Sequence, residues 1–208
     1  MQDLLLFPYS GTAIEALDCL DEQWRCIGFI SDDETLIGKE FFGINVFSRT
    51  AFTDFPDAKV LAVHGSPGSY TNRETILQSL NIAADRFATV IHKNASISPR
   101  STIGYNVLIM AGVVITANAT IGNHVIVLPN SVIHHDSKIG DCTLIAANVT
   151  VAGNVDVGNS CYLGAASSIK NGITIGEKTL MGIGANVIES FPGHNKLVGN
   201  PARPLSRQ

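Results

Sequence analysis

A repeat of six residues runs through the second half of the chain and limits its possible folds more than any other feature. Starting at Ile91, every sixth residue is aliphatic or methionine as far as Val187, which makes seventeen consecutive positions. A second period of eighteen residues is superimposed, because glycine follows the aliphatic residue in every third repeat, at Gly104, Gly122, Gly140, Gly158 and Gly176. Three hexads therefore form one structural unit.

The two periods predict a coil with three short, straight sides. A period of six fits neither an α-helix of 3.6 residues per turn nor a free strand with a period of two. It fits a prism in which each hexad contributes one side and one corner, and the aliphatic residues of successive coils stack about 4.8 Å apart. Asparagine and glycine tolerate the positive φ of tight corners, so we expect corners at Asn94, Asn106, Asn118, Asn130, Asn148, Asn154 and Asn171.

Composition changes abruptly near residue 90, where we place a domain boundary. Residues 1–90 hold 19 of the 32 charged residues, thirteen acidic and six basic, whereas residues 91–190 hold ten. We expect residues 1–90 to form one domain, residues 91–192 to form the prism and residues 193–208 to form a C-terminal tail. A one-dimensional stack of coils has open ends, which the first domain and the tail would cover.

The first domain alternates apolar runs with helical patterns. Strands are predicted over 4–7, 26–30 and 59–63, and helices over 14–20 and 71–80. This order predicts a small, parallel, Rossmann-like α/β sheet, whose ligands would lie beyond the carboxyl ends of its strands. The loop after the first strand lacks the GxGxxG pattern, which disfavours an unmodified NAD site.

Composition also excludes several classes of function. With 15% charged residues and a net charge of −4, the chain lacks the basic surface that nucleic-acid binding requires. The apolar run at the N-terminus stops at Pro8, too early for a secretory signal or a membrane span, so we expect a cytoplasmic protein with no membrane contact. Its four cysteines have no CxxC spacing, which argues against a zinc site or a disulfide framework, and we expect no metal.

The repeat resembles that of the hexapeptide-repeat acyltransferases, and this resemblance implies a left-handed parallel β-helix and a homotrimer with active sites between neighbouring prisms. The whole chain is similar to a narrower group, the nucleotide-sugar N-acetyltransferases of the PglD, NeuD and PerB type. The segments that carry the similarity are GFISDD at 28–33, IGK at 37–39, GINV at 43–46, SVIHHDSKIG at 131–140, AGNV at 152–155 and VGNPAR at 198–203.

The resemblance identifies His135 as the catalytic base and Asp136 as its acidic partner, although the group more often has glutamate there. Histidine suits the removal of a proton from an amine near neutral pH. His135 also lies two residues after the inward-facing Ile133, so its ring can project from the prism. From the residues alone, the two histidines at 134 and 135 are equally compatible with solvated polar positions on a surface coil.

Gly153 lies eighteen residues after His135, one coil further along. The resemblance places the thioester beside it, where a backbone N–H can stabilise an oxyanion; an ordinary corner glycine is the alternative. The ending resembles the loop that covers coenzyme A, and the corresponding residues here are Gly199, Asn200, Pro201, Ala202 and Arg203. Where some members have a second histidine nine residues after the catalytic one, this chain has Leu144.

The nucleotide sugar is expected in the first domain. The glycine-rich N-terminal signature of the group is replaced here, but Ser10, Gly11 and Thr12 with the following helix could still hold a diphosphate. Asp32 and Asp33 match residues that contact the base in related enzymes, and carboxylates accept hydrogen bonds from ring N–H groups. The alternative for the two aspartates is a solvated strand end.

The resemblance thus implies an acetyl-CoA-dependent N-acetyltransferase that acts on a nucleotide-linked amino sugar. The expected sugar is a 4-amino-4,6-dideoxyhexose linked to dTDP, UDP or GDP and destined for a surface glycan such as the lipopolysaccharide O-antigen. Two alternatives stay open: a sugar O-acetyltransferase of the sialic acid type, since a histidine base serves a hydroxyl equally well, and a non-catalytic β-helix that binds partners or acts as a scaffold.

Overall fold

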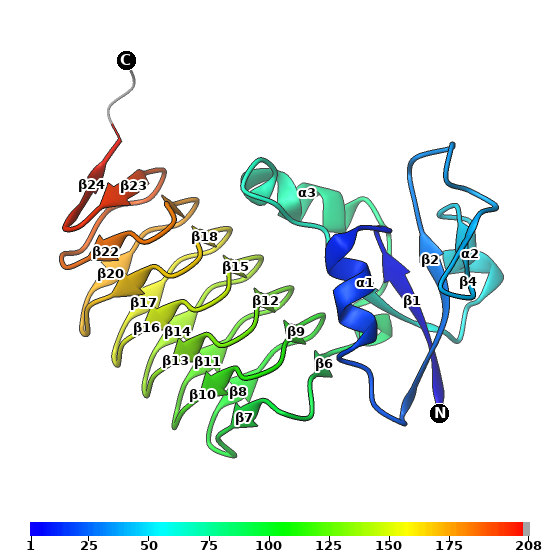
Figure 1. Cartoon of the computed structure of the whole chain (residues 1–208), viewed down its shortest axis with the longest axis horizontal. Helices are drawn as coiled ribbons and strands as arrows, with labels where there is room; N and C mark the ends of the chain where they lie inside the picture. Colours follow the sequence, from blue (N-terminus) through cyan, green and yellow to red (C-terminus); the bar gives the residue numbers. More distant parts are fainter. Residues whose placement is uncertain (206–208) are drawn as a thin grey trace.

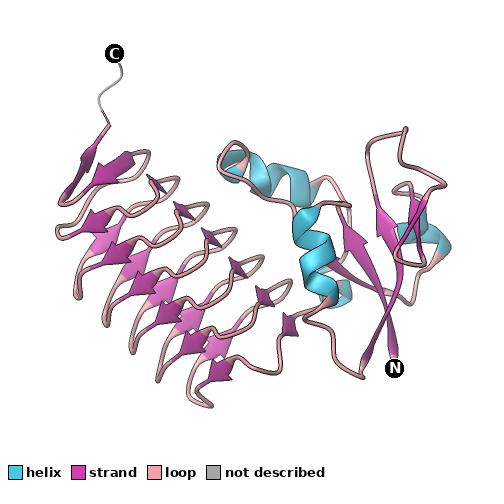
Figure 2. Cartoon of the chain, viewed as in Figure 1, coloured by secondary structure: helices cyan, strands magenta, loops and turns pink. Residues whose placement is uncertain are grey.

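The computed structural model describes residues 1–205, an α/β part followed by a stack of coils that begins with strand β6 at Val90. Figures 1 and 2 show the stack extending away from the α/β part, with the C-terminal strands at its far end. The tail that we expect over 193–208 is described only as far as residue 205, because residues 206–208 lie outside the described residues.

The α/β part contains a five-stranded sheet in the order β3-β4-β2-β1-β5. Its strands are β1 (Gln2–Phe7), β2 (Trp24–Ile30), β3 (Glu40–Phe41), β4 (Ile44–Phe47) and β5 (Lys59–Ala62). All pairs are parallel except β3–β4. The parallel arrangement predicted for the strands at 4–7, 26–30 and 59–63 is thus confirmed in β1, β2 and β5, and the antiparallel pair at the edge was not predicted. Phe42 and Gly43 both have positive φ, 58° and 74°, which is the conformation of a tight hairpin turn and forces the two strands to run antiparallel.

The helices of this part are short. They are α1 (Gly11–Leu17), α2 (Ala51–Asp54) and α3 (Arg73–Gln78), with 3₁₀ turns η1 (Tyr70–Asn72) and η2 (Ala84–Arg86). The helix predicted over 14–20 begins earlier, because the Ser10 hydroxyl accepts a hydrogen bond from the Ala13 N–H and caps it. The helix predicted over 71–80 begins as the turn η1. No helix in the described part of the chain is long enough to cross a bilayer.

The coils build a three-sided parallel β-helix, the left-handed form that the resemblance implies. Each side consists of two-residue strands, and three sheets run along the prism. Face 1 holds β6 (Val90–Ile91), β9 (Leu108–Ile109), β12 (Ile126–Val127), β15 (Leu144–Ile145), β18 (Tyr162–Leu163), β21 (Leu180–Met181), β23 (Lys196–Gly199) and β24 (Ala202–Pro204).

Faces 2 and 3 complete the prism. Face 2 holds β7 (Ser96–Ile97), β10 (Val114–Ile115), β13 (Val132–Ile133), β16 (Thr150–Val151), β19 (Ser168–Ile169) and β22 (Asn186–Val187). Face 3 holds β8 (Thr102–Ile103), β11 (Thr120–Ile121), β14 (Lys138–Ile139), β17 (Asp156–Val157) and β20 (Thr174–Ile175). Between β6 and β22 the strands pair at a spacing of eighteen residues, for example Ile115 with Ile97 and Ile133, whereas β21 pairs with β23 at a spacing of sixteen.

The core consists of the predicted aliphatic ladders. From Ile109 to Val187, each residue of the six-residue series is at most 2% exposed. The first three members, Ile91, Ile97 and Ile103, are only partly buried, because they belong to the first coil, which has no coil before it. The β-branched side chains suit this packing since their restricted χ1 loses little entropy in a strand.

Three ladders of corner residues separate the faces. Left-handed backbone occurs at Gly112, Asn130, Asn148, Ala166 and Gly184 between faces 1 and 2; at Asn118, Asp136, Asn154 and Gly172 between faces 2 and 3; and at Asn106, His124, Cys142, Ser160, Lys178 and His194 between faces 3 and 1. Five of the seven predicted asparagine corners are confirmed. Asn94 and Asn171 also lie in corner turns, but their φ is not positive; beside Asn171 it is Gly172 that takes the left-handed conformation, at lower steric cost.

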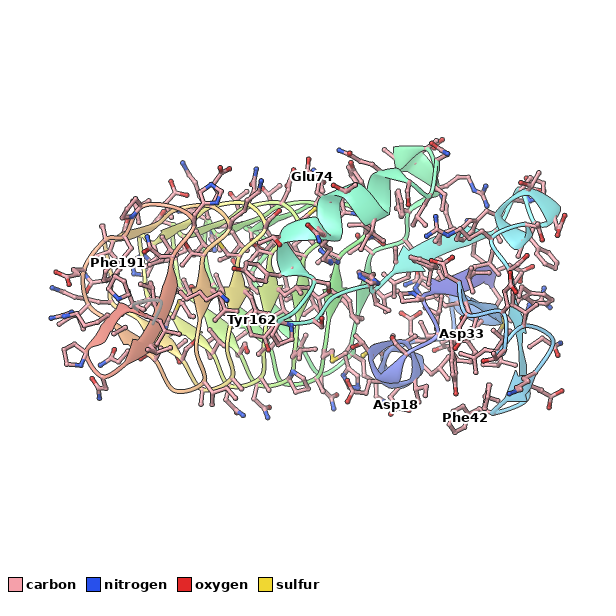
Figure 3. All side chains as sticks on the ribbon, turned by 90° about the horizontal axis from the view of Figure 1, so that it is seen from above. Asp18, Asp33, Phe42, Glu74, Tyr162 and Phe191 are labelled. Carbon is pink, nitrogen blue, oxygen red and sulfur yellow. The ribbon has the colours of Figure 1, made fainter. Side chains whose placement is uncertain are left out.

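The α/β part packs on face 1. Leu108, Met110, Ile126 and Leu144 from this face share an apolar cluster with Leu4, Leu6 and Tyr70. Seen from above, the segment before α3 passes over the prism at Tyr162 (Figure 3), and the rings of Tyr70 and Tyr162 lie 6.4 Å apart. The corner between faces 2 and 3 is therefore opposite the side of the prism that the α/β part covers.

Candidate active site

His135 and Asp136 form a hydrogen-bonded pair on the corner between faces 2 and 3. The His135 Nδ1 lies 2.8 Å from the Asp136 Oδ2. Neighbouring residues can pair in this way because Asp136 has the left-handed backbone of the corner, with φ of 61°, which turns its side chain back toward the preceding residue. The two side chains are 56% and 45% exposed, so the pair is accessible from outside the prism.

Asn118 supports this pair from the preceding coil. It occupies the equivalent corner eighteen residues earlier, and its Nδ2 donates to the Asp136 Oδ1 at 3.1 Å. Hydrogen bonds from His135 and Asn118 hold the pKa of Asp136 below its ordinary value. Asp136 is therefore an acceptor at neutral pH, so Nδ1 of a neutral His135 carries the proton and Nε2 presents a lone pair. We did not predict Asn118 as a site residue, although the period of eighteen points to it.

Gly153 lies against the other edge of the imidazole. A Cβ atom at this position would stand 2.6 Å from the His135 Nε2 and 2.7 Å from its Cε1. Gly153 and Asn154 together form the corner turn of this coil, and the residue with left-handed backbone is Asn154, whose φ is 58°, so the turn itself does not require glycine at 153. Glycine is required here because any side chain would meet the histidine ring.

The backbone around the pair is fixed by hydrogen bonds to the next coil. The Asn154 N–H donates to the His135 carbonyl at 3.0 Å. The buried Ser137 hydroxyl donates to the Ala152 carbonyl at 2.8 Å and accepts from the Val155 N–H at 3.2 Å. The imidazole is thus attached to a rigid column, and its orientation depends on its own side-chain torsions and on Asp136.

A cavity of about 150 Å³ lies between the α/β part and face 1. Thr12 and residues 65–67 form one wall, and the opposite wall includes Leu144 and Tyr162. Leu144, which replaces the second histidine of the resemblance, packs directly on Gly65: a Cβ on Gly65 would stand 2.6 Å from a Leu144 Cδ. Of the three loop residues predicted to hold a diphosphate, Thr12 lines this cavity, Gly11 begins α1 and Ser10 caps it.

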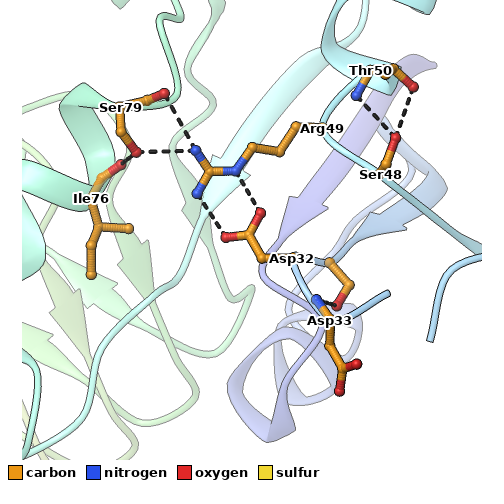
Figure 4. A network of polar contacts seen from close by, with 8 residues as sticks. Asp32, Asp33, Ser48, Arg49, Thr50, Ile76 and Ser79 are labelled. Carbon is orange, nitrogen blue, oxygen red and sulfur yellow. Dashed lines mark hydrogen bonds and ion pairs between the residues drawn. The ribbon is translucent and has the colours of Figure 1, made fainter. Parts of the chain in front are cut away.

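The two aspartates of the second loop already have partners within the chain, and Figure 4 shows the contact of Asp32 with Arg49. Asp32 accepts two hydrogen bonds from Arg49, at 2.6 and 2.7 Å, and the same guanidinium donates to the Ser79 hydroxyl at 3.1 Å. Asp33 accepts from the hydroxyl and the N–H of Thr35, which lowers the pKa of Asp33. The ion pair limits the acceptor capacity of Asp32, and Arg49 is a neighbour that the sequence did not suggest.

The segment predicted to cover coenzyme A forms the hairpin of β23 and β24 at the far end of the prism. Gly199 has a φ of 95° and, with Asn200 and Pro201, makes the turn. Asn200 accepts a hydrogen bond from Asn186 at 3.1 Å, and Ala202 is buried. Arg203 is exposed and pairs with Glu189 at 2.9 Å. Within residues 1–205 there is no group of three or more His, Cys, Asp or Glu side chains that could hold a metal ion.

The structure brings some of these residues together and keeps others apart. His135, Asp136 and Gly153 meet on one corner, together with Asn118. Thr12 and the loop that follows β5 meet on face 1, which is the opposite side of the prism (Figure 1). Within one chain, the His135–Asp136 pair therefore does not face the cavity between the α/β part and face 1.

Comparison with solved structures gives matches over the whole chain. PerB from Caulobacter crescentus, in complex with CoA and GDP-perosamine, is 24% identical with a TM-score of 0.84, and the alignment covers 99% of this chain and 98% of PerB. The acetyltransferase domain of PglB from Neisseria gonorrhoeae, in complex with acetyl coenzyme A, is 21% identical with a TM-score of 0.85, covering 98% and 99% of the two chains. The chain has the fold of PerB.

The resemblance that we found in the sequence is thus confirmed at the level of the fold. WeeI from Acinetobacter baumannii shares it as well, with 26% identity, a TM-score of 0.83 and coverage of 99% of this chain and 100% of WeeI. A family model described as the GMPPB C-terminal domain matches residues 87–183 of this chain, which include most of the β-helix. No curated protein sequence matches the chain.

Proposed function

We propose that the protein is an acetyl-CoA-dependent N-acetyltransferase that acts on the amino group of a nucleotide-linked amino sugar. The observation that carries the proposal is the His135–Asp136 pair, with its Nε2 edge over Gly153, within a fold shared with PerB, which was solved with CoA and GDP-perosamine. The sugar is a 4-amino-4,6-dideoxyhexose used for a surface glycan, and the nucleotide is dTDP, UDP or GDP.

In this proposal His135 acts as the general base. The sugar ammonium first loses one proton to solvent; as the neutral amine attacks, Nε2 removes a second proton from its nitrogen, while Nδ1–H stays bonded to Asp136, which stabilises the imidazolium that forms. The amine nitrogen forms a bond to the thioester carbonyl carbon. When the tetrahedral intermediate collapses, the C–S bond breaks, and the imidazolium returns the proton so that the thiol of coenzyme A leaves. Atoms and charge balance without a metal.

Gly153 suits the role of oxyanion donor. Within residues 1–205 its N–H donates to no other group, whereas the N–H of the next residue, Asn154, is used by the His135 carbonyl. A backbone N–H that is fixed by the stacked coils, and lies beside the base, needs no reorganisation when negative charge develops on the carbonyl oxygen. The absence of a side chain also leaves room for the thioester to approach the backbone.

The positions of the two candidate sites support a homotrimer. His135 is opposite the face that carries the cavity with Thr12, so a nucleotide sugar held by the α/β part of one chain would meet the histidine of a neighbouring chain. Acetyl-CoA would then lie along the prism, with its nucleotide end at Gly199, Asn200, Pro201, Ala202 and Arg203. Within residues 1–205 the one ion pair of Arg203 is with the exposed carboxylate of Glu189, an interaction weak enough for a phosphate to replace.

The deciding experiment incubates the protein with acetyl-CoA and a panel of dTDP-, UDP- and GDP-linked amino sugars and measures thiol release. Each amino sugar is paired with its hydroxy analogue, because turnover of the hydroxy form would identify an O-acetyltransferase instead. His135→Ala should abolish turnover, whereas His92→Ala, in the first coil, should not. If no panel member is turned over and calorimetry detects no binding of coenzyme A, the proposal is wrong and a non-catalytic binding role is favoured.

A further inference from the structure

Arg73 is a buried cation at the start of α3. It is 0% exposed and is the largest side chain buried to this extent. No carboxylate within residues 1–205 forms an ion pair with it. Two of its nitrogens donate instead to main-chain carbonyls, Nε to that of His64 and Nη1 to that of His124, whereas the buried Nη2 has no hydrogen-bond partner within residues 1–205. Burial lowers the pKa of Arg73 to about 10, so the guanidinium is still charged at neutral pH.

The two carbonyls belong to the two parts of the molecule. His64 follows β5 in the α/β part, and His124 is a corner residue of the prism. Asn106 makes a second link beside the first, because its amide exchanges two hydrogen bonds with Ala62, at 2.7 and 3.0 Å, and its Nδ2 lies 2.8 Å from the His124 Nδ1. Burial lowers the pKa of His124 to about 4, so that ring is neutral and Nδ1 accepts from Asn106. Burial also lowers the pKa of His64, so at neutral pH Arg73 carries the only charge among these five residues.

The loop that begins at His64 is the one that lines the cavity on face 1. Residues 65–67 form one wall of this cavity, opposite Leu144. The loop is a compact unit, since the Ser66 N–H donates to the Ser69 hydroxyl at 3.0 Å and the Gly68 N–H to the Ser66 hydroxyl at 3.3 Å. Arg73 follows the loop in the chain, and its side chain donates a hydrogen bond to the carbonyl of His64, where the loop begins. One guanidinium therefore fixes both ends of the loop to the prism.

We propose that Arg73 is a positioning residue for the sugar-binding cavity: it holds the loop 65–69 against face 1 and so sets the distance between that loop and Leu144. This inference rests on the proposed function, which puts the nucleotide sugar beside Thr12. A lone ion is expensive to bury, and the planar fork of arginine is what allows one side chain to bond two fixed carbonyls in different directions. Lysine has a compact charge and a flexible stem, so it cannot replace that geometry.

The test compares Arg73→Lys and Arg73→Met with Arg86→Lys. Arg86 is a matched control because it also donates to main-chain carbonyls, those of Phe52, Phe55 and Ala58, but all of these lie within the α/β part and away from the cavity. Arg73→Met also removes the buried charge, so it is expected to fold even where Arg73→Lys does not. Steady-state kinetics are measured with a nucleotide amino sugar that the wild-type protein acetylates, and they give separate KM values for the sugar and for acetyl-CoA. Hydrogen exchange of residues 64–69 reports on the loop without any substrate.

We expect the KM of the nucleotide sugar to rise about tenfold in both Arg73 variants, as for the loss of one charge-assisted hydrogen bond. The KM of acetyl-CoA and kcat should stay within about twofold, exchange at 65–69 should become faster, and Arg86→Lys should change none of these. Equal losses in all kinetic parameters, unchanged exchange at 65–69, or failure of both Arg73 variants to fold would each overturn the proposal. If the wild type turns over no sugar, the proposed function fails, and the exchange data still decide whether Arg73 holds the loop.

Discussion

The contact between Gly153 and His135 makes Gly153→Ala the sharpest test of the site. The new Cβ would stand 2.6 Å from Nε2, whereas ordinary contacts between such atoms are 3.4 Å or longer. The imidazole must therefore move by about 1 Å or rotate away from its place beside Asp136. A displacement of this size in a catalytic group costs about 100-fold in rate, which corresponds to about 2.7 kcal/mol of transition-state stabilisation.

The fold should tolerate this substitution. Gly153 does not have a positive φ, so alanine can adopt its backbone conformation. The His135 side chain is 56% exposed and can turn into solvent without leaving a cavity. We expect the free energy of unfolding to change by less than about 1 kcal/mol, and a thermal melt should show this. The loss should then appear in kcat, with the backbone N–H of residue 153 still present.

A double-mutant cycle separates this mechanism from others. The assay measures thiol release for Gly153→Ala, His135→Ala and the double variant. If alanine at 153 acts only by displacing the imidazole, it should have no further effect in the His135→Ala background. Activity of Gly153→Ala within about threefold of the wild type would refute the argument, because the base would then not depend on the place that the structure gives its ring.

Three further predictions follow from the corner and the core. Asp136→Asn should lower kcat about tenfold, less than His135→Ala. The pKa of Asp136 is lowered in the folded state, so the ionised carboxylate stabilises the folded protein above the unfolded pKa, and this stabilisation is lost as pH falls. The difference in melting temperature between Asp136→Asn and the wild type should therefore narrow below about pH 4. Ile133→Ala, at a fully buried ladder position, should cost about 2–5 kcal/mol in denaturant unfolding, against less than about 0.5 kcal/mol for the exposed Lys138→Ala on the next strand. Ala166→Gly should stabilise the protein by about 1 kcal/mol in the same assay, because Ala166 has a φ of 56° that only glycine adopts without strain; a loss of stability would contradict this account of the corners.

The β-helix could be predicted because its contacts are periodic. A period of eighteen residues states which strands pair, so the register of Ile115 on Ile97 and Ile133 follows from counting. The same counting places Gly153 one coil after His135, and it would have placed Asn118 one coil before Asp136. The His135–Asp136 pair was found through the resemblance, and the repeat adds only that His135 lies two residues after the inward-facing Ile133, where its side chain can project from the prism.

The α/β part was predicted less well because its contacts are not periodic. The antiparallel pairing of β3 and β4 depends on two residues with positive φ, Phe42 and Gly43, and a phenylalanine gives no signal for such a turn. The ion pair between Asp32 and Arg49 joins two loops seventeen residues apart, and neither residue type specifies a partner at that distance.

The periodic contacts of the prism and the non-periodic contacts of the α/β part position different parts of the candidate site. The positions of His135, Asp136 and Gly153 depend on the stacking of successive coils, in which each residue contacts the residues eighteen positions before and after it. The cavity that would hold the sugar depends on Gly65 against Leu144 and on Arg73 at the joint, which are single contacts between unlike parts. Changes in residues 64–73 should therefore alter which substrate binds while the acyl-transfer geometry at His135 stays the same. Leu144 is an example: it stands where some members of the resembling group have a second histidine, while the segment around His135 matches the group. This difference changes the wall of the cavity on face 1 and leaves the corner with His135 unchanged.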